Sequence, residues 1–297
     1  MASPRPWLAA VALAAAAAGL VDVTITRAEP AGATTDAARA VTVPTTPTPA
    51  ATASSAPSVP VERPAWARAN VATIWVKPNR PRPVDRPALL RHPRIARWID
   101  DMTLAQRRDL TDRVMTQVLR GERVEVQRTR SDGWSRVRLP TQTGSAFPTG
   151  IIGWVPSRQL SASPVETATP AVVRRSERTG ARVVQIARDY LGVRYLWGGM
   201  SSHGIDCSGL TYQVYRRVGR TLPRDAADQA RVGRPVGRHH LHRGDLVFFG
   251  PGGWRTIHHV GIYAGHGKVL HAPFTGSRVQ ITPLRAWSDY WGARRYL

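Results

Sequence analysis

The chain has 297 residues, enough for one large domain or two small ones, and its apolar fraction of 42% allows a sizeable core and excludes wholesale disorder. The formal charge is +22, from 42 basic and 20 acidic residues, and the basic residues are spread along the chain without forming a tail. This distribution argues against nucleic acid as the partner. It leaves two interpretations, a solvated arginine-rich surface or binding to another anionic partner, such as an anionic lipid or an anionic cell-wall polymer.

The first 33 residues have the composition of a secretory signal peptide. An apolar, alanine-rich run covers residues 8–21, and small residues follow it. The run is short for a membrane span, and the single cysteine, Cys207, is too far away for lipid attachment at a cleavage site. We expect removal of residues 1–33 and an exported protein without a membrane span, located in the cell envelope, the periplasm or the extracellular space. An uncleaved anchor or a buried helix is the alternative.

Residues 34–65 are rich in Thr, Pro and Ala, which predicts a disordered stalk. Residues 66–160 then predict a first domain, a small β-barrel made mostly of short strands. Its expected elements are a helix over 104–119, strands over 123–126, 134–139 and 151–156, and a hairpin turn at 131–133. Residues 161–178 return to a linker composition, and residues 179–297 predict a second domain.

Cys207 opens a predicted helix in the second domain. Leu210, Val214 and Val218 follow at a spacing of four, and Gly219 is a suitable helix end. A thiol at a helix N-terminus faces unpaired amides, which are expected to lower its pKa and to hold an oxyanion. The alternative is a free cysteine that serves as a small buried hydrophobe.

Two histidines are expected to accompany the thiol. The pattern predicts strands over 259–264 and 268–272, joined by a turn at 265–267, so His259 and His271 should lie nearly opposite each other. One imidazole can then act as the base and the other can orient it, which gives a Cys-His-His arrangement. The alternative is that both are ordinary hydrogen-bonded strand residues.

The sequence predicts no metal site and no cofactor. One cysteine excludes an internal disulfide and any zinc site with several thiolates. The segment 239–242 holds three histidines but lies in an arginine-rich loop without an acidic neighbour before Asp245. Among the tryptophans, Trp197 and Trp254 are the best candidates to line a groove.

The second domain resembles the NlpC-type cell-wall peptidases, which are papain-like cysteine peptidases. Six segments in order carry the resemblance: Tyr195–Gly199, Gly204–Leu210, Leu222–Asp225, Gly244–Phe249, His259–Tyr263 and Leu270–Pro273. The resemblance implies an α+β fold, with helices packed on an antiparallel sheet. It also implies roles: Cys207 as nucleophile, His259 as base, His271 as orienting residue, Tyr195 as a partner of the oxyanion, and Asp206 and Ser208 beside the substrate.

The first domain resembles a small bacterial SH3-type β-barrel, through Gly121–Val124, Asp132–Val137 and Gly153–Pro156. Together the two domains resemble γ-D-glutamyl-L-diamino-acid endopeptidases. In those enzymes an acidic residue after the Leu-Pro-Arg turn recognises the free amine of the terminal L-Ala, and here Arg224 is followed by Asp225. A Glu and a Tyr of the first domain usually complete that amine pocket, whereas Met115 and Ile151 stand at those places in this chain.

These observations predict an exported, monomeric cysteine endopeptidase that acts on peptidoglycan stem peptides. The expected bond lies between D-Glu and diaminopimelate or Lys. The expected substrate-binding residues are Asp206, Ser208, Arg224, Asp225 and Trp197. The alternatives are a catalytically silent wall-binding module, and an amidase or acyltransferase built on the same fold.

Overall fold

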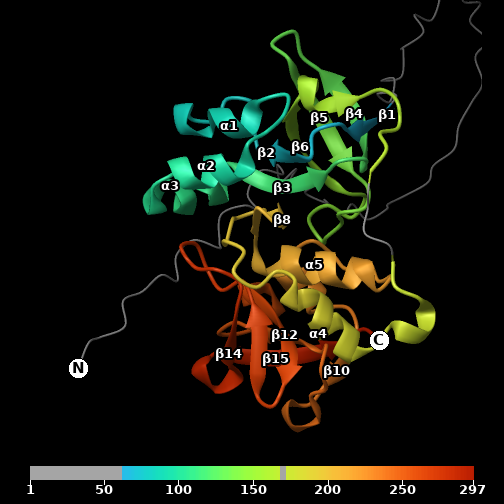
Figure 1. Cartoon of the computed structure of the whole chain (residues 1–297), viewed down its shortest axis with the longest axis vertical. Coiled ribbons are helices and arrows are strands. Elements are labelled where there is room, and N and C mark those ends of the chain that lie inside the picture. Colours follow the sequence, from blue (N-terminus) through green and yellow to red (C-terminus); the bar gives the residue numbers. More distant parts are fainter. Residues whose placement is uncertain (1–61, 168–171) are drawn as a thin grey trace, which may run out of the picture. The chain divides into compact units, whose positions relative to one another are not determined.

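The computed structural model describes residues 62–167 and 172–297 (Figure 1). The expected signal peptide and nearly all of the expected stalk lie outside the described residues. Within the described residues, no helix is both long and apolar enough to cross a membrane. The described residues carry two sheets of six or more strands.

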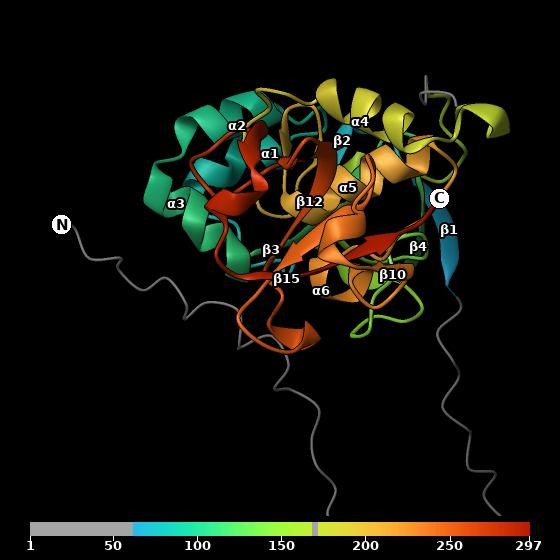
Figure 2. The same cartoon turned by 90° about the horizontal axis from the view of Figure 1, so that it is seen from below.

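Residues 63–161 form what we call the N-terminal β module, a seven-stranded sheet with three short helices (Figure 2). The strands pair antiparallel in the order β3-β2-β6-β5-β4-β1-β7. The elements are β1 (Arg63–Ala67), β2 (Val71–Trp75), α1 (Arg86–Leu89), α2 (Ile95–Asp101), α3 (Leu104–Arg108), β3 (Val114–Leu119), β4 (Arg123–Thr129), β5 (Trp134–Leu139), β6 (Ile151–Pro156) and β7 (Leu160–Ser161).

The prediction of a helix over residues 104–119 is wrong in its second half. Only α3 is helical in the α form, and β3 follows it as a strand paired with β2. The apolar spacing of four between Val114 and Val118 satisfies a helix, but it is also a multiple of the two-residue period of a strand. The β-branched Val114, Thr116 and Val118 are all buried in β3, and such side chains favour strands.

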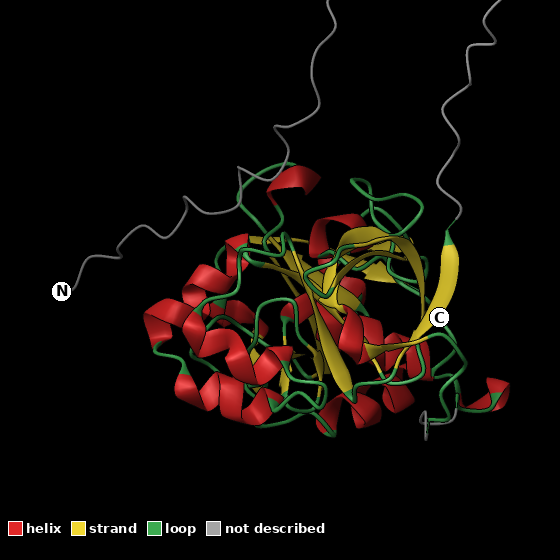
Figure 3. Ribbon diagram, turned by 90° about the horizontal axis from the view of Figure 1, so that it is seen from above, coloured by secondary structure: helices red, strands yellow, loops and turns green. Residues whose placement is uncertain are grey.

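Residues 180–295 form what we call the C-terminal domain, an α+β unit built on a six-stranded antiparallel sheet (Figures 2 and 3). The strand order is β10-β15-β11-β12-β13-β14, and β8 and β9 form a separate pair. The elements are α4 (Gly180–Arg188), β8 (Met200–Ser201), β9 (Gly204–Ile205), α5 (Cys207–Arg217), α6 (Ala226–Gln229), β10 (Arg234–Val236), β11 (Leu246–Phe249), β12 (His259–Gly265), β13 (Lys268–His271), β14 (Gln280–Pro283) and β15 (Tyr290–Arg295).

The central strands of this sheet are buried on both faces. Val260 and Ile262 of β12 join a core with apolar residues of α4 and α5. Val247 and Phe249 of β11 face the other way and join a second cluster with Val269. The alternation along β11 and β12 therefore assigns one face to the two helices and the other to the residues that surround His259.

Candidate active site

Cys207 is the first residue of α5, as the sequence predicts, and its side chain is buried. Asp206 caps the helix, since its Oδ1 accepts a 2.6 Å hydrogen bond from the N–H of Gly209. The N–H of Val260 on β12 points at the thiol. The nucleophile candidate is therefore held between the start of a helix and the second residue of a central strand.

His259 and His271 form a direct hydrogen bond of 2.8 Å between Nε2 and Nδ1. They are not directly opposite each other, because irregular pairing near the turn sets Ile262 opposite Leu270 and therefore Gly261 opposite His271. The two histidines are thus diagonal neighbours. A Cβ on Gly261 would lie 3.1 Å from Cβ of His271 and closer still to Val269, so only glycine leaves this approach open.

The buried Nδ1 of His259 has no hydrogen-bond partner within the described residues. It is the acceptor that remains for the proton of a thiol. A neutral His259 that accepts at Nδ1 carries its own proton on Nε2 and donates it to His271. His271 then carries its proton on Nε2, where Oγ1 of Thr282 accepts at 2.9 Å.

Thr282 and Trp287 continue this series of hydrogen bonds, and no sequence signal pointed to either. We call His259, His271, Thr282 and Trp287 the histidine row. The indole N–H of Trp287 donates to Oγ1 of Thr282 at 3.3 Å. The Trp287 ring stacks on His259, with centroids 4.9 Å apart and planes 16° apart, and meets His271 edge-on at 5.1 Å. Phe249 adds a third ring beside His259 at 5.5 Å. Both imidazoles are therefore fixed by aromatic contacts as well as by hydrogen bonds.

The expected lowering of the thiol pKa is wrong for the free protein. Burial first, with the nearby carboxylate of Asp206 second, raises the pKa of Cys207 to about 12, and together they outweigh the favourable N–H of Val260. Burial also lowers the pKa of His259 well below its usual range, with the neighbouring His271 and His258 acting in the same direction. The resting pair is a neutral thiol beside a neutral imidazole.

Tyr195 lies next to this pair. Its side chain is buried, and burial is the main cause that raises its pKa well above the usual value. The phenol therefore stays protonated and can donate a hydrogen bond. The N–H of Cys207 is among the first amides of α5, which have no partner within the helix. Both donors can face an oxygen that becomes negative when the thiol attacks a carbonyl.

Asp206, Ser208 and Arg224 are buried and bonded to one another. Arg224 forms a bidentate pair with Asp206 at 3.1 and 2.7 Å, and donates to Oγ of Ser208 at 2.9 Å. Its Nε donates to Oγ1 of Thr116, a residue of β3 in the N-terminal β module. These three candidate substrate-binding residues therefore bond to one another and hold the start of α5.

The N-terminal β module makes further buried contacts here. Oε1 of Gln117 accepts from the N–H of Met200, and Gln142 bonds to both Thr116 and Gln117. The indole of Trp197 donates to the carbonyl of Val114 at 3.0 Å, so its N–H is already used. Sequence reasoning missed this polar contact, because nothing in one sequence pairs a glutamine of one domain with an amide of another.

Asp225 differs from the other candidates because its side chain is exposed. Its Oδ1 accepts from the N–H of Ala227 at 2.9 Å and caps α6. Oδ2 has no hydrogen-bond partner within the described residues, so it is available to a cationic group. Among the described residues, no three His, Cys, Asp or Glu side chains are grouped so as to hold a metal ion.

Comparisons with known proteins agree with this geometry. A model of the NlpC/P60 family matches residues 192–296. A γ-D-glutamyl-L-lysine dipeptidyl-peptidase of Bacillus subtilis (strain 168) is 34% identical over 271 residues, which cover 72% of this chain and 91% of that protein. The murein DD-endopeptidase MepH of Escherichia coli K12 is 43% identical over 116 residues, which cover 36% and 42% respectively. The crystal structure of an NlpC/P60 family protein from Bacillus cereus ATCC 10987 superposes with a TM-score of 0.70 at 26% identity, covering 79% of this chain and 99% of that one.

Proposed function

Because the chain belongs to the NlpC/P60 family of cysteine peptidases, we propose that it hydrolyses peptidoglycan stem peptides with Cys207 as nucleophile, His259 as base and His271 as orienting residue. The observation that carries the proposal is the arrangement around His259. Its Nδ1 is buried and unpartnered, its Nε2 bonds to His271, and the thiol lies against the next residue of the same strand.

The reaction follows from the neutral resting pair. As Sγ of Cys207 attacks the carbonyl carbon, its proton moves to Nδ1 of His259, and the carbonyl oxygen takes the negative charge. Tyr195 and the N–H of Cys207 donate to that oxygen. The amine then leaves with the proton from His259. Water next attacks the thioester, gives a proton to His259, and releases the acid and the thiol.

The scissile bond we propose is the γ-D-Glu–diaminopimelate or γ-D-Glu–Lys bond. Two observations support it: the match to a γ-D-glutamyl-L-lysine dipeptidyl-peptidase over 91% of that protein, and the exposed Asp225, with one carboxylate oxygen unpaired. Met115 is half-buried and Ile151 is buried, and neither can bind an ammonium group. We therefore propose that Asp225 alone contacts a free amine and that stems attached to sugar are also accepted.

We further propose that the protein acts outside the cytoplasm, in the cell envelope or beyond it. The signal-like composition of residues 1–33 and the peptidoglycan-directed names of the relatives support this location. We also propose that the N-terminal β module is of the SH3 type and that the protein works as a monomer.

The test is a product analysis. The purified chain is incubated with L-Ala-γ-D-Glu-diaminopimelate peptides, either free or attached to muramic acid, and the products are identified by mass spectrometry. We expect cleavage after D-Glu in both. Cleavage of the free peptide alone would show that a complete amine pocket exists. Products cut at another bond would indicate an amidase or acyltransferase, and no product from either would indicate a silent wall-binding module.

Thr282 provides a test of the histidine row. We expect Thr282→Val to lower kcat about fivefold with KM unchanged, because the loss of one hydrogen bond of about 1 kcal/mol leaves His271 free to turn. Thr282→Ser keeps the hydroxyl and should retain nearly full activity. Steady-state kinetics on a soluble stem peptide measure both variants, and equal activity of the Val and Ser variants would show that the hydroxyl has no part in positioning.

The low pKa of His271 predicts a loss of stability in acid. Burial lowers this pKa from 6.5 to about 4, so the folded protein binds this proton less tightly than the unfolded chain does. The stabilising contribution is therefore complete above pH 6.5 and is lost as the pH falls towards 4. From pH 7 to pH 5 the free energy of unfolding should fall by about 2 kcal/mol through this residue.

Chemical denaturation at the two pH values measures this effect, with His271→Asn as the comparison. The variant lacks the titrating ring, while its carboxylates are unchanged, so it should lose about 2 kcal/mol less than the natural protein between pH 7 and pH 5. The same loss in both proteins would mean that His271 is not kept neutral by burial.

A further inference from the structure

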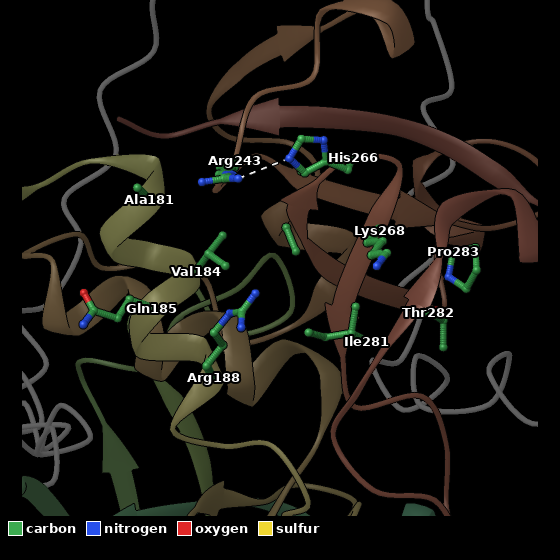
Figure 4. Close-up of a pocket in the computed structure, with 12 residues that line it drawn as sticks. Ala181, Val184, Gln185, Arg188, Arg243, His266, Lys268, Ile281, Thr282 and Pro283 are labelled. Carbon is green, nitrogen blue, oxygen red and sulfur yellow. Dashed lines mark hydrogen bonds between the residues drawn. The ribbon is translucent and has the colours of Figure 1, made fainter.

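A cavity of about 660 Å³ lies on the C-terminal domain, between α4 and the turn that joins β12 to β13 (Figure 4). Its lining includes Gly265 and His266 of the hairpin turn. His259 is at the other end of β12, six residues away, which is about 20 Å along a strand. The cavity therefore lies at the opposite end of β12 from His259, although Thr282, whose Oγ1 bonds to His271, also contributes to its lining.

Basic side chains surround this cavity without acidic partners. Arg188 comes from α4, Arg243 from the loop before β11, and Lys268 from β13. Figure 4 shows the three arranged around the same space, and no Asp or Glu contributes to the lining. Within residues 62–167 and 172–297, none of the three takes part in an ion pair, whereas many other arginines do, for example Arg217 and Arg295.

Arg243 is held in place at this cavity. Its guanidinium lies against Gly265, where a Cβ would come within 2.9 Å of Nε, so the bare backbone of a glycine makes room for it. Its backbone abuts Gly180, the first residue of α4. Its Nη2 donates to Nε2 of His266 at 3.3 Å, so a guanidinium has an imidazole, and no anion, as its side-chain partner. An anion in the cavity would supply the missing charge.

Apolar side chains also line the cavity. They come from Val184 of α4, Ala264 of β12 and Ile281 of β14, and we call these three residues the apolar floor. Its volume lies in the range of sites that hold small molecules. A ligand that matches both parts has carbon-rich sugar or polyol faces and more than one negative charge, because three basic side chains line the cavity.

We propose that this cavity binds phosphate groups carried on a sugar or polyol chain, as in a phosphodiester polymer of the cell wall. Arg188, Arg243 and Lys268 bind the phosphates, and the apolar floor contacts the carbon skeleton. The polymer then holds the enzyme while Cys207 and His259, at the far end of β12, remain free to act on a stem peptide. This binding does not depend on the proposed cleavage reaction.

The lysines provide a direct probe, because Lys77 and Lys268 are the only two in the chain. Both are exposed, and Lys77 lies in the N-terminal β module. The whole chain is treated briefly with an amine-acylating reagent, with and without poly(glycerol phosphate), and the two sites are quantified by mass spectrometry. We expect the polymer at ten times its dissociation constant to slow acylation of Lys268 about tenfold and to leave Lys77 unchanged.

The variant Arg188→Glu/Arg243→Glu keeps Lys268 as reporter and should abolish the protection. The matched control is Arg220→Glu/Arg234→Glu, which removes the same charge at exposed positions outside the cavity lining. Arg188→Glu alone repeats the test with little risk to folding, since its side chain makes no hydrogen bond within the described residues. Cleavage of a soluble stem peptide at the natural rate by each variant confirms that the protein is folded.

Four results would overturn the proposal. Equal protection of Lys77 and Lys268 would show diffuse attraction to a basic surface. Protection that survives in the cavity variant would place the polymer elsewhere. Protection by inorganic phosphate at the same phosphate concentration would assign the site to the free ion, and protection by a stem peptide but not by the polymer would assign it to a carboxylate ligand.

Discussion

Replacement of Cys207 by alanine should abolish cleavage of stem peptides, lowering kcat by at least about 10³-fold, because the proposed reaction has no path without the thiol. The chain has no other cysteine that could take over. Cys207→Ser should be nearly as inactive, since a hydroxyl is a weaker nucleophile than a thiol and His259, whose pKa is low, is a weak base for it.

This loss should occur in a folded protein. The side chain of Cys207 is small and makes no side-chain ion pair, so the alanine variant should keep its thermal midpoint within a few degrees. Mass spectrometry of the products and a thermal melt of the same samples make the comparison. Cleavage by the alanine variant at a rate close to that of the natural protein would mean that the nucleophile is another residue.

Arg224→Met should produce the largest loss of stability, about 3–5 kcal/mol. The side chain of Arg224 is 5% exposed, and its removal leaves the carboxylate of Asp206 charged and buried. Ser208 and Thr116 also lose their donor. Because Asp206 caps α5, the start of that helix should loosen, and kcat should fall together with stability.

Denaturant unfolding measures the effect, with Arg220→Met as the control, since this exposed arginine has no ion pair in the described part of the chain. The control should stay within about 0.5 kcal/mol of the natural protein. The double variant Arg224→Met/Asp206→Asn should be less destabilised than the sum of the two single variants, because the buried charge is gone. A loss of stability in Arg224→Met no greater than in the control would mean that the pair contributes nothing.

The sequence sufficed to predict the elements whose periodicity and end signals agree. The helix that starts at Cys207 has an apolar face and Gly219 beyond its end, and the structure confirms it. The strands around Trp134 and Trp154 were likewise predicted from their alternation and the Gly133 turn. Local signals of this kind act within a few residues and need no knowledge of the partner.

What could not be predicted depends on contacts between distant segments. The strand β3 was interpreted as helix because its apolar spacing fits both periods, and its pairing with β2 decides the outcome. The raised pKa of Cys207 comes from burial, which the helix position alone does not reveal. Thr282 bonds to His271 across two strands, and a single threonine in a strand carries no mark of such a partner.

The buried polar contacts between β3 and the start of α5 bear on how such enzymes can be recombined. A C-terminal domain cut free at the linker would expose the amide of Met200 and the guanidinium of Arg224 to water. In the N-terminal β module, Gln117 and Thr116 would lose these two donors. The covalent linker keeps the two surfaces at a high effective concentration, so they dock without needing high affinity. Chimaeras that exchange one half should therefore function only if the incoming half keeps these polar partners.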